Sequence, residues 1–169
     1  MSAPLGIEVA RGRDELLDAP RPLWLGLRDH HHAIAPELGA IHDDDESWMR
    51  RRAQYAQWLA DDERAFFLLA RRAGALIAYA FARPVPPTSP TWSGEHDLLE
   101  IETLSVAPET RGTGIGAHLI ALAREEVERQ GYAGLSLVAV AANRDALRFY
   151  EREGFAPAFI VLRDTRRRP

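Results

Sequence analysis

The chain has 169 residues, a usual length for a single domain, and its 46% hydrophobic and 27% charged residues are ordinary for a globular protein. Its formal net charge of -4 argues against a nucleic-acid partner, because proteins of that class usually present a basic face. There is no cysteine, so a thiol nucleophile and a thiolate metal site are excluded. No segment approaches the roughly 20 apolar residues that cross a bilayer, and no signal-peptide pattern precedes the domain, so we expect a cytoplasmic protein without a membrane partner.

The first half of the chain predicts two helices followed by a hairpin. The expected elements are a short strand at 7–9, helices at about 21–32 and 46–60, and strands at 66–70 and 75–81. Pro20 and Pro22 are tolerated only near the start of the first helix. Asp43, Asp44 and Asp45 are candidate N-caps of the second. The joining sequence Arg-Arg-Ala-Gly, at 71–74, is typical of a hairpin turn.

The second half alternates strands with helices. The expected elements are an exposed proline-rich loop at 84–94, a strand at 97–106, a helix at about 113–130, a strand at 135–140, a helix at 144–153 and a last strand near 159–162. The run 135–140 is apolar on both faces, as in a central strand covered by helices, and the intervening helix implies that it lies parallel to the strand before it.

A glycine-rich turn joins the strand at 97–106 to the helix after it. Residues 104–116 read Leu-Ser-Val-Ala-Pro-Glu-Thr-Arg-Gly-Thr-Gly-Ile-Gly. Free N–H groups of a helix start, with glycines that let a ligand approach, suit a pyrophosphate, and Arg111 adds positive charge. A plain turn at a helix start is the alternative. A P-loop is excluded because the chain has no lysine, and Gly131 to Val140 lacks the acidic residue that a dinucleotide site would need.

Two motifs in order resemble the GNAT superfamily of N-acetyltransferases. Arg111, Gly114 and Gly116 match its acyl-CoA motif, Arg/Gln-x-x-Gly-x-Gly/Ala, and residues 143–155 resemble the motif that follows it, in which an asparagine opens a short helix that carries a tyrosine and ends at Gly-Phe. The resemblance spans about residues 100 to 163. It implies an α/β fold with a mixed, strongly twisted sheet of six to seven strands flanked by helices.

The resemblance also implies a division of the chain and a function. Residues 1–169 would form one acetyltransferase domain, with the helices at about 21–60 on the acceptor side and 97–163 as the acetyl-CoA core. The function would be acetyl transfer from acetyl-CoA to an amine by direct attack, and a homodimer is also expected. The alternative is a non-catalytic acyl-CoA-binding or regulatory module. The cofactor contacts implied are Leu104, Ser105, Val106, Arg111, Gly112, Thr113, Gly114, Ile115, Gly116, Asn143 and Phe149.

Acetyl transfer to a protonated amine needs a base, and two glutamates precede the cofactor motif. Period-2 geometry would aim Glu100 and Glu102 at one face of the strand together with Leu104 and Val106. Both could instead be solvated or paired with arginines. The family resemblance slightly favours Glu100, and a β-bulge between the two would separate them. Backbone N–H groups near Leu104 and Val106 are candidate oxyanion donors.

The helix at 144–153 supplies the remaining candidates. By resemblance, Tyr150 would protonate the departing thiolate, and the alternative is a buried aromatic beside Phe149. Asn143 could bind the pantetheine arm, cap the helix, or do both.

No metal is expected. His30, His31 and His32 are consecutive, so their side chains diverge by about 100° on a helix, and no His-x-x-x-His spacing occurs. A histidine lining the acceptor cleft is an alternative use of this run. The residues 43–46, Asp-Asp-Asp-Glu, could attract a cationic amine, although capping explains them as well. The acceptor itself is not identified by any of these patterns.

Overall fold

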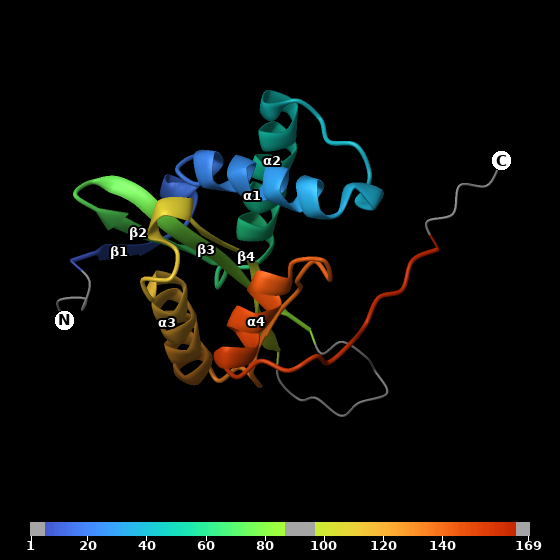
Figure 1. Ribbon diagram of the computed structural model, residues 1–169. Helices are drawn as coiled ribbons and strands as arrows, with labels where there is room; N and C mark the ends of the chain where they lie inside the picture. Colours follow the sequence, from blue (N-terminus) through green and yellow to red (C-terminus); the bar gives the residue numbers. More distant parts are fainter. Residues whose placement is uncertain (1–5, 87–96, 165–169) are drawn as a thin grey trace.

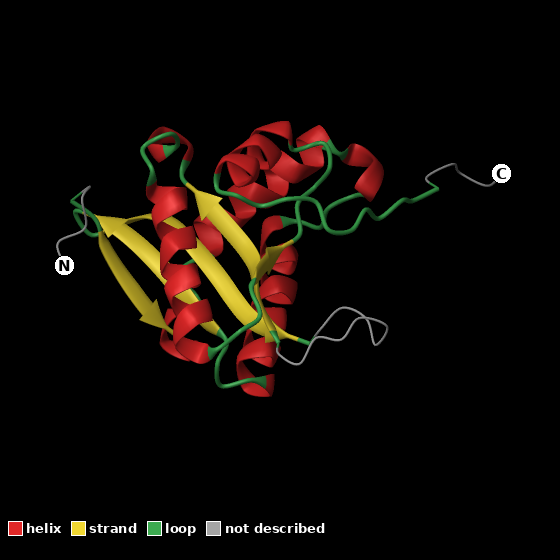
Figure 2. Ribbon diagram, turned by 90° about the horizontal axis from the view of Figure 1, so that it is seen from below, coloured by secondary structure: helices red, strands yellow, loops and turns green. Residues whose placement is uncertain are grey.

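A computed structural model, which describes residues 6–86 and 97–164, has one five-stranded sheet covered by helices on both faces (Figures 1 and 2). The strands are β1 (Glu8–Gly12), β2 (Phe66–Arg72), β3 (Ala75–Val85), β4 (Leu98–Val106) and β5 (Leu135–Leu137), and the helices are α1 (Arg21–Ile34), α2 (Asp44–Asp61), α3 (Ile115–Gln130) and α4 (Arg144–Arg152). The strands follow one another in chain order across the sheet. β1 to β4 are antiparallel and β5 is parallel to β4, so the sheet is mixed, as predicted.

The β2–β3 hairpin confirms the predicted turn at its last two residues. Arg72 pairs with Ala75, which leaves a two-residue loop of Ala73 and Gly74. Both have positive φ, 48° and 81°, as a turn that matches the twist of a hairpin requires. Glycine adopts this conformation at little cost, whereas Ala73 is the only non-glycine residue in the described segments that does so.

Each face of the sheet has its own core. On one face the rings of Phe67, Tyr79 and Phe81 pack against Tyr55 and Trp48 of α2. On the other face the small residues Ala78, Ala80 and Ala82 of β3 alternate with those rings and leave room for Ile115 and Leu119 of α3. In Figure 1, α1 and α2 accordingly lie on one side of the strands, and α3 and α4 lie on the other. The alternation along β3 therefore sorts aromatic from small side chains between the two layers.

The predicted strand count is wrong, since the described chain has five strands rather than six to seven. The predicted strand at 135–140 ends at Leu137 and lies at the edge of the sheet rather than in its centre, and the one near 159–162 does not form. Side chains 159–162 are 67% to 89% exposed. Apolar character alone does not make a strand, because a strand needs a neighbour that takes its backbone hydrogen bonds, and no other strand in the described residues pairs with this run.

Most of the other element boundaries lie within a few residues of prediction. β3 continues to Val85, into the expected 84–94 loop, whose remainder from 87 lies outside the described residues. Within 6–86 and 97–164, no helix combines the length and apolar character that a membrane span requires.

Candidate acetyl-transfer site

The edge of β4 that faces β5 is only partly paired. β5 pairs with Leu99, Glu100 and Ile101 and then ends. On its other edge, β4 pairs with β3 as far as Val106. In the described structure, therefore, no strand hydrogen-bonds to the outward-facing backbone N–H and C=O groups of 102–106. This edge is open to an extended ligand, which would bind as an additional strand does. Figure 2 shows the short β5 beside the longer β4.

A bulge in β4 changes which side chains share a face. Phe81 of β3 pairs with Thr103 and the next residue, Ala82, pairs with Ile101, so Glu102 is the extra residue. Ile101 packs in the α3 core, and Leu104 packs there as well, although the two are three residues apart. Glu100 and Glu102 thus share the α1/α2 face, as predicted of the pair. The prediction that Leu104 and Val106 lie with them is wrong, because the bulge reverses the alternation after it.

The two glutamates are held by one arginine. Arg83 pairs in register with Glu100 on the α1/α2 face, and its Nη2 is 2.5 Å from Oε1 of Glu102 but 3.8 Å from Oε1 of Glu100. The Nε of Arg83 donates a further hydrogen bond to Glu102 at 2.5 Å. Burial raises the pKa of Glu100, the charge of Glu102 raises it further, and Arg83 opposes both effects. Glu102 is therefore the carboxylate that is hydrogen-bonded to Arg83, whereas Glu100 lies farther from it.

Two side chains flank this cluster. The Arg83 guanidinium lies 4.7 Å from the ring centre of Trp58 in α2, which in turn stacks on Phe81. On the other side, Ser136 of β5 is the neighbour of Glu100 in register. The buried Ser136 hydroxyl makes no hydrogen bond of ordinary geometry within the described chain, yet it is near enough to lower the pKa of Glu100. Arg83, Glu100 and Ser136 thus form a row across three strands.

Behind the bulge lies a buried group of three hydroxyls. The Tyr55 hydroxyl of α2 is 2.8 Å from that of Thr103 and 3.3 Å from that of Tyr79. All three residues are buried. These bonds attach α2 to β4 immediately after Glu102.

The glycine-rich turn forms the predicted helix start. A 3-10 turn over Pro108–Thr110 leads to Gly114, which has φ 86° and precedes α3. Gly112 also has positive φ, and a side chain added there would meet no atom within 4 Å. The Nε of Arg111 donates to the carbonyl of Val106 at 3.1 Å, so the arginine folds back over the end of β4. The first turn of α3 has free N–H groups at this open surface, which suits an anion.

Phe149 of α4 lies against the start of α3. A Cβ added at Gly116 would lie 3.1 Å from the Phe149 ring, so this glycine permits the close approach. The Oδ1 of Asn143 accepts from the Ala146 N–H at 3.2 Å, which confirms the capping role. Tyr150 packs with Phe149 and Phe155, at ring distances of 5.2 and 5.8 Å. Burial raises the pKa of Tyr150 to about 12, so the residue is both a core aromatic and a protonated hydroxyl at neutral pH.

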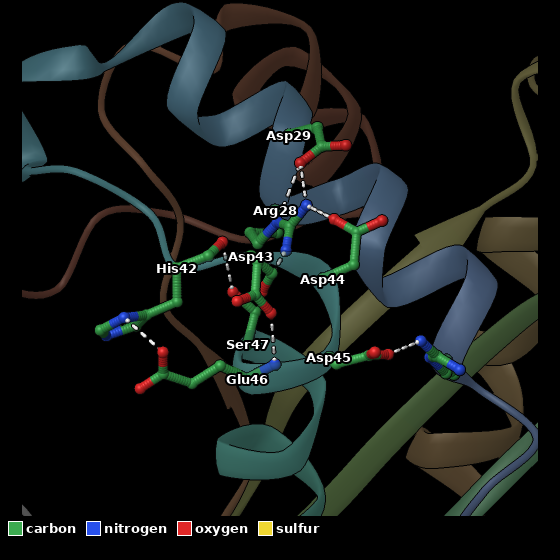
Figure 3. A network of polar contacts seen from close by, with 9 residues as sticks. Arg28, Asp29, His42, Asp43, Asp44, Asp45, Glu46 and Ser47 are labelled. Carbon is green, nitrogen blue, oxygen red and sulfur yellow. Dashed lines mark hydrogen bonds and ion pairs between the residues drawn. The ribbon is translucent and has the colours of Figure 1, made fainter.

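The acidic residues at the start of α2 have structural partners (Figure 3). Asp43 accepts from the Glu46 N–H at 2.9 Å and is the N-cap of α2. Asp44 and Asp45 pair with Arg28 and Arg21 of α1, at 2.7 and 2.5 Å. Glu46 pairs with Arg50, and it also pairs with His42 when that histidine is protonated. Capping and helix pairing therefore account for this cluster.

Within the described ranges, no group of histidine and acidic side chains could hold a metal ion. His30 and His31 contact each other, with ring centres 6.0 Å apart, and burial lowers the pKa of His31.

Sequence reasoning missed Arg83, Ser136 and the hydroxyl group of Tyr55. Arg83 is a lone basic residue at the end of an apolar strand, a pattern that could have signalled a buried partner. Ser136 is likewise the one polar residue within the apolar run 135–140.

Known proteins resemble this chain in sequence. The model of the acetyltransferase (GNAT) family matches residues 24–155. A mycothiol acetyltransferase from Brachybacterium faecium is 30% identical over 154 residues, which cover 85% of this chain and 45% of that protein. An aminoalkylphosphonate N-acetyltransferase from Salmonella typhimurium is 45% identical over 56 residues, 33% of this chain and 36% of that protein. The chain spans less than half the length of these curated relatives.

Solved structures share the fold. A protein from Bacillus halodurans has a TM-score of 0.77 at 17% identity, covering 92% of this chain and 97% of its own. An aminoglycoside N-acetyltransferase in complex with CoA has a TM-score of 0.68 at 18% identity, covering 99% of both chains. At these identities the likeness concerns the fold alone.

Proposed function

Because the chain belongs to the GNAT family of acetyltransferases, we propose that it is an acetyl-CoA-dependent N-acetyltransferase that acts on an acceptor amine. The observation that carries the proposal is the open β4 edge at 102–106. It has a pair of carboxylates at one end and the glycine-rich start of α3 at the other. An extended thioester arm laid along this edge would join an anion site to a proton acceptor.

The chain offers three groups of contacts to acetyl-CoA in this proposal. The N–H groups of 112–116, with Arg111, would bind the pyrophosphate. The backbone of 104–106 would bind the pantetheine arm. Asn143 and Phe149 would contact the arm from α4, and the amide nitrogen of Asn143 is available because its oxygen makes the cap. The core at 97–163 would thus hold the donor, and the helices at 21–60 would form the acceptor side.

The chemistry is the formation of a bond from the amine nitrogen to the acetyl carbon while the carbon–sulfur bond breaks. Glu100 accepts the proton that the amine loses, directly or through water. N–H groups near Leu104 and Val106 donate to the oxyanion of the tetrahedral intermediate. Tyr150, whose hydroxyl is protonated at neutral pH, donates its proton to the departing thiolate. A general base such as Glu100 contributes about 10²- to 10⁴-fold to the rate.

The test combines binding with turnover. Calorimetry measures acetyl-CoA affinity, and thiol release with mass spectrometry measures transfer to a panel that includes aminoalkylphosphonates, aminoglycosides, polyamines, amino acids and peptides. We expect saturable binding and a product 42 Da heavier than one of the amines, the mass of an acetyl group that replaces a hydrogen. Binding without transfer to any amine would favour the non-catalytic acyl-CoA module, and no binding would reject both functions.

A bulky residue at Gly112 tests the anion site itself. Gly112→Trp should abolish acetyl-CoA binding, because the side chain would enter the open space where the pyrophosphate is proposed to lie. Gly74→Trp is the matched control, since Gly74 has φ 81° against 73° for Gly112 and equally open surroundings, but lies in the β2–β3 turn. Equal affinities of the two variants would contradict the proposed cradle.

A further inference from the structure

The two carboxylates of the proposed site differ in their contacts, although they are two residues apart on one strand. Glu102 receives two hydrogen bonds or ion-pair contacts from Arg83 at 2.5 Å. Glu100 lies 3.8 Å from the same guanidinium, beyond hydrogen-bonding distance. The bulge creates this difference, because it moves Glu102 out of register while Glu100 stays opposite Arg83.

Arg83 is itself fixed in place. Its guanidinium lies over Trp58, whose ring stacks on Phe81 at an interplanar angle of 20°, and its backbone belongs to β3. About a quarter of its side chain is exposed, so its charge is only partly screened by solvent. A guanidinium held in this way can select one carboxylate by geometry, which a flexible surface arginine could not.

We propose that Arg83 is a positioning residue that binds Glu102 and thereby leaves Glu100 as the carboxylate that accepts the proton of the acceptor amine. This inference rests on the proposed function for the role of Glu100, but the division of the pair by Arg83 can be measured without turnover. Without Arg83, the negative charges of Glu100 and Glu102 would lie close together with no positive charge beside them. The two carboxylates would then share one proton up to a higher pH.

The groups that act on Glu100 are few. Glu102 and Arg83 are the charged ones, and Ser136 contributes a hydroxyl from β5. From α2, Tyr55 lies near Glu102, and Arg51 lies over the Tyr55 ring at 5.4 Å. The titration of Glu100 should therefore respond mainly to changes at Arg83 and Glu102.

The experiment is a carboxyl-carbon NMR titration of glutamate-labelled protein, with the Glu100 signal identified by its loss in Glu100→Gln. Arg83→Met should shift the Glu100 midpoint upward by about one pH unit or more, and Glu102→Gln should shift it downward by a similar amount. The double variant should return close to the wild type, because it removes a neutral pair. Arg52 of α2 pairs with Asp18 at the surface, so Arg52→Met is the charge-matched control and should leave the Glu100 midpoint unchanged.

A packing role for Arg83 predicts a different result. Arg83→Met would then leave the Glu100 midpoint where it is, and the double variant would not differ from Glu102→Gln, either of which would overturn the inference. The acetyl-transfer assay separates the two proposals. Full activity of Glu100→Gln would refute the base in the proposed function, while opposite midpoint shifts would still support the division of the pair by Arg83.

Discussion

Removal of the Tyr55 hydroxyl should destabilise the fold through the three buried hydroxyls behind the β4 bulge. Tyr55→Phe deletes the atom that bonds Thr103 at 2.8 Å and Tyr79 at 3.3 Å. The side chains of Tyr55 and Tyr79 are 0% exposed and Thr103 is 5% exposed, so water cannot replace the lost partner. A buried polar group left without a partner costs about 1–3 kcal/mol, and we expect a loss of about 2 kcal/mol.

The measurement is urea unfolding followed by circular dichroism, with thermal unfolding as a second probe. A loss of about 2 kcal/mol corresponds to a fall in Tm of about 4–8 °C for a chain of this size. Tyr79→Phe is the control, because it removes only the 3.3 Å contact and leaves the bond between Tyr55 and Thr103 in place. If Tyr79→Phe cost as much as Tyr55→Phe, or if Tyr55→Phe were as stable as the wild type, the shared-hydroxyl argument would be refuted.

Three further outcomes are expected. Asp43→Ala should lower the free energy of unfolding by about 1 kcal/mol through loss of the α2 cap, whereas Asp45→Ala, which breaks an exposed ion pair, should cost less than about 0.5 kcal/mol in the same urea assay. The pKa of Glu100 is raised in the folded protein, so protonated Glu100 stabilises the fold, and this stability is lost as pH rises through the folded pKa. Glu100→Gln should therefore have a higher Tm than the wild type at pH 7 and an equal Tm near pH 4. A lower Tm of the variant at pH 7 would contradict the direction of this pKa shift. Tyr150→Phe should lower kcat by about 10²-fold with acetyl-CoA affinity unchanged, and wild-type turnover would remove Tyr150 from the acid role.

The elements were predictable wherever local pattern and tertiary packing agree. The helix predicted at 46–60 forms as α2, and Trp48, Tyr55 and Leu59 are buried on it. The apolar run at 159–162 shows the limit, because strand formation depends on a pairing partner elsewhere in the molecule.

Some parts of the candidate site are determined by local sequence and others by contacts between strands. The glycine-rich turn is local, so its sequence fixes its geometry closely. The bulge at Glu102 leaves a trace in the sequence, because the apolar positions change from odd (99 and 101) to even (104 and 106) across two consecutive polar residues. A plain period-2 assignment overlooks this change, and the register against β3 shows that Glu102 is the extra residue. Arg83 was missed for the same reason, since its contact with Glu102 depends on pairing between strands separated by a long connection.

The bulge has a consequence for how this chain is aligned with its relatives. On β4, odd and even positions exchange layers at Glu102, so side chains before and after it cannot be assigned to a face by counting in twos. A relative with one residue fewer at this point could have the same sequence before and after the deletion. Either its acidic residues or its apolar residues would then face the helices on the other side of the sheet. Insertions and deletions between Ile101 and Thr103 should therefore be treated as changes in which face of β4 the residues of the proposed site occupy.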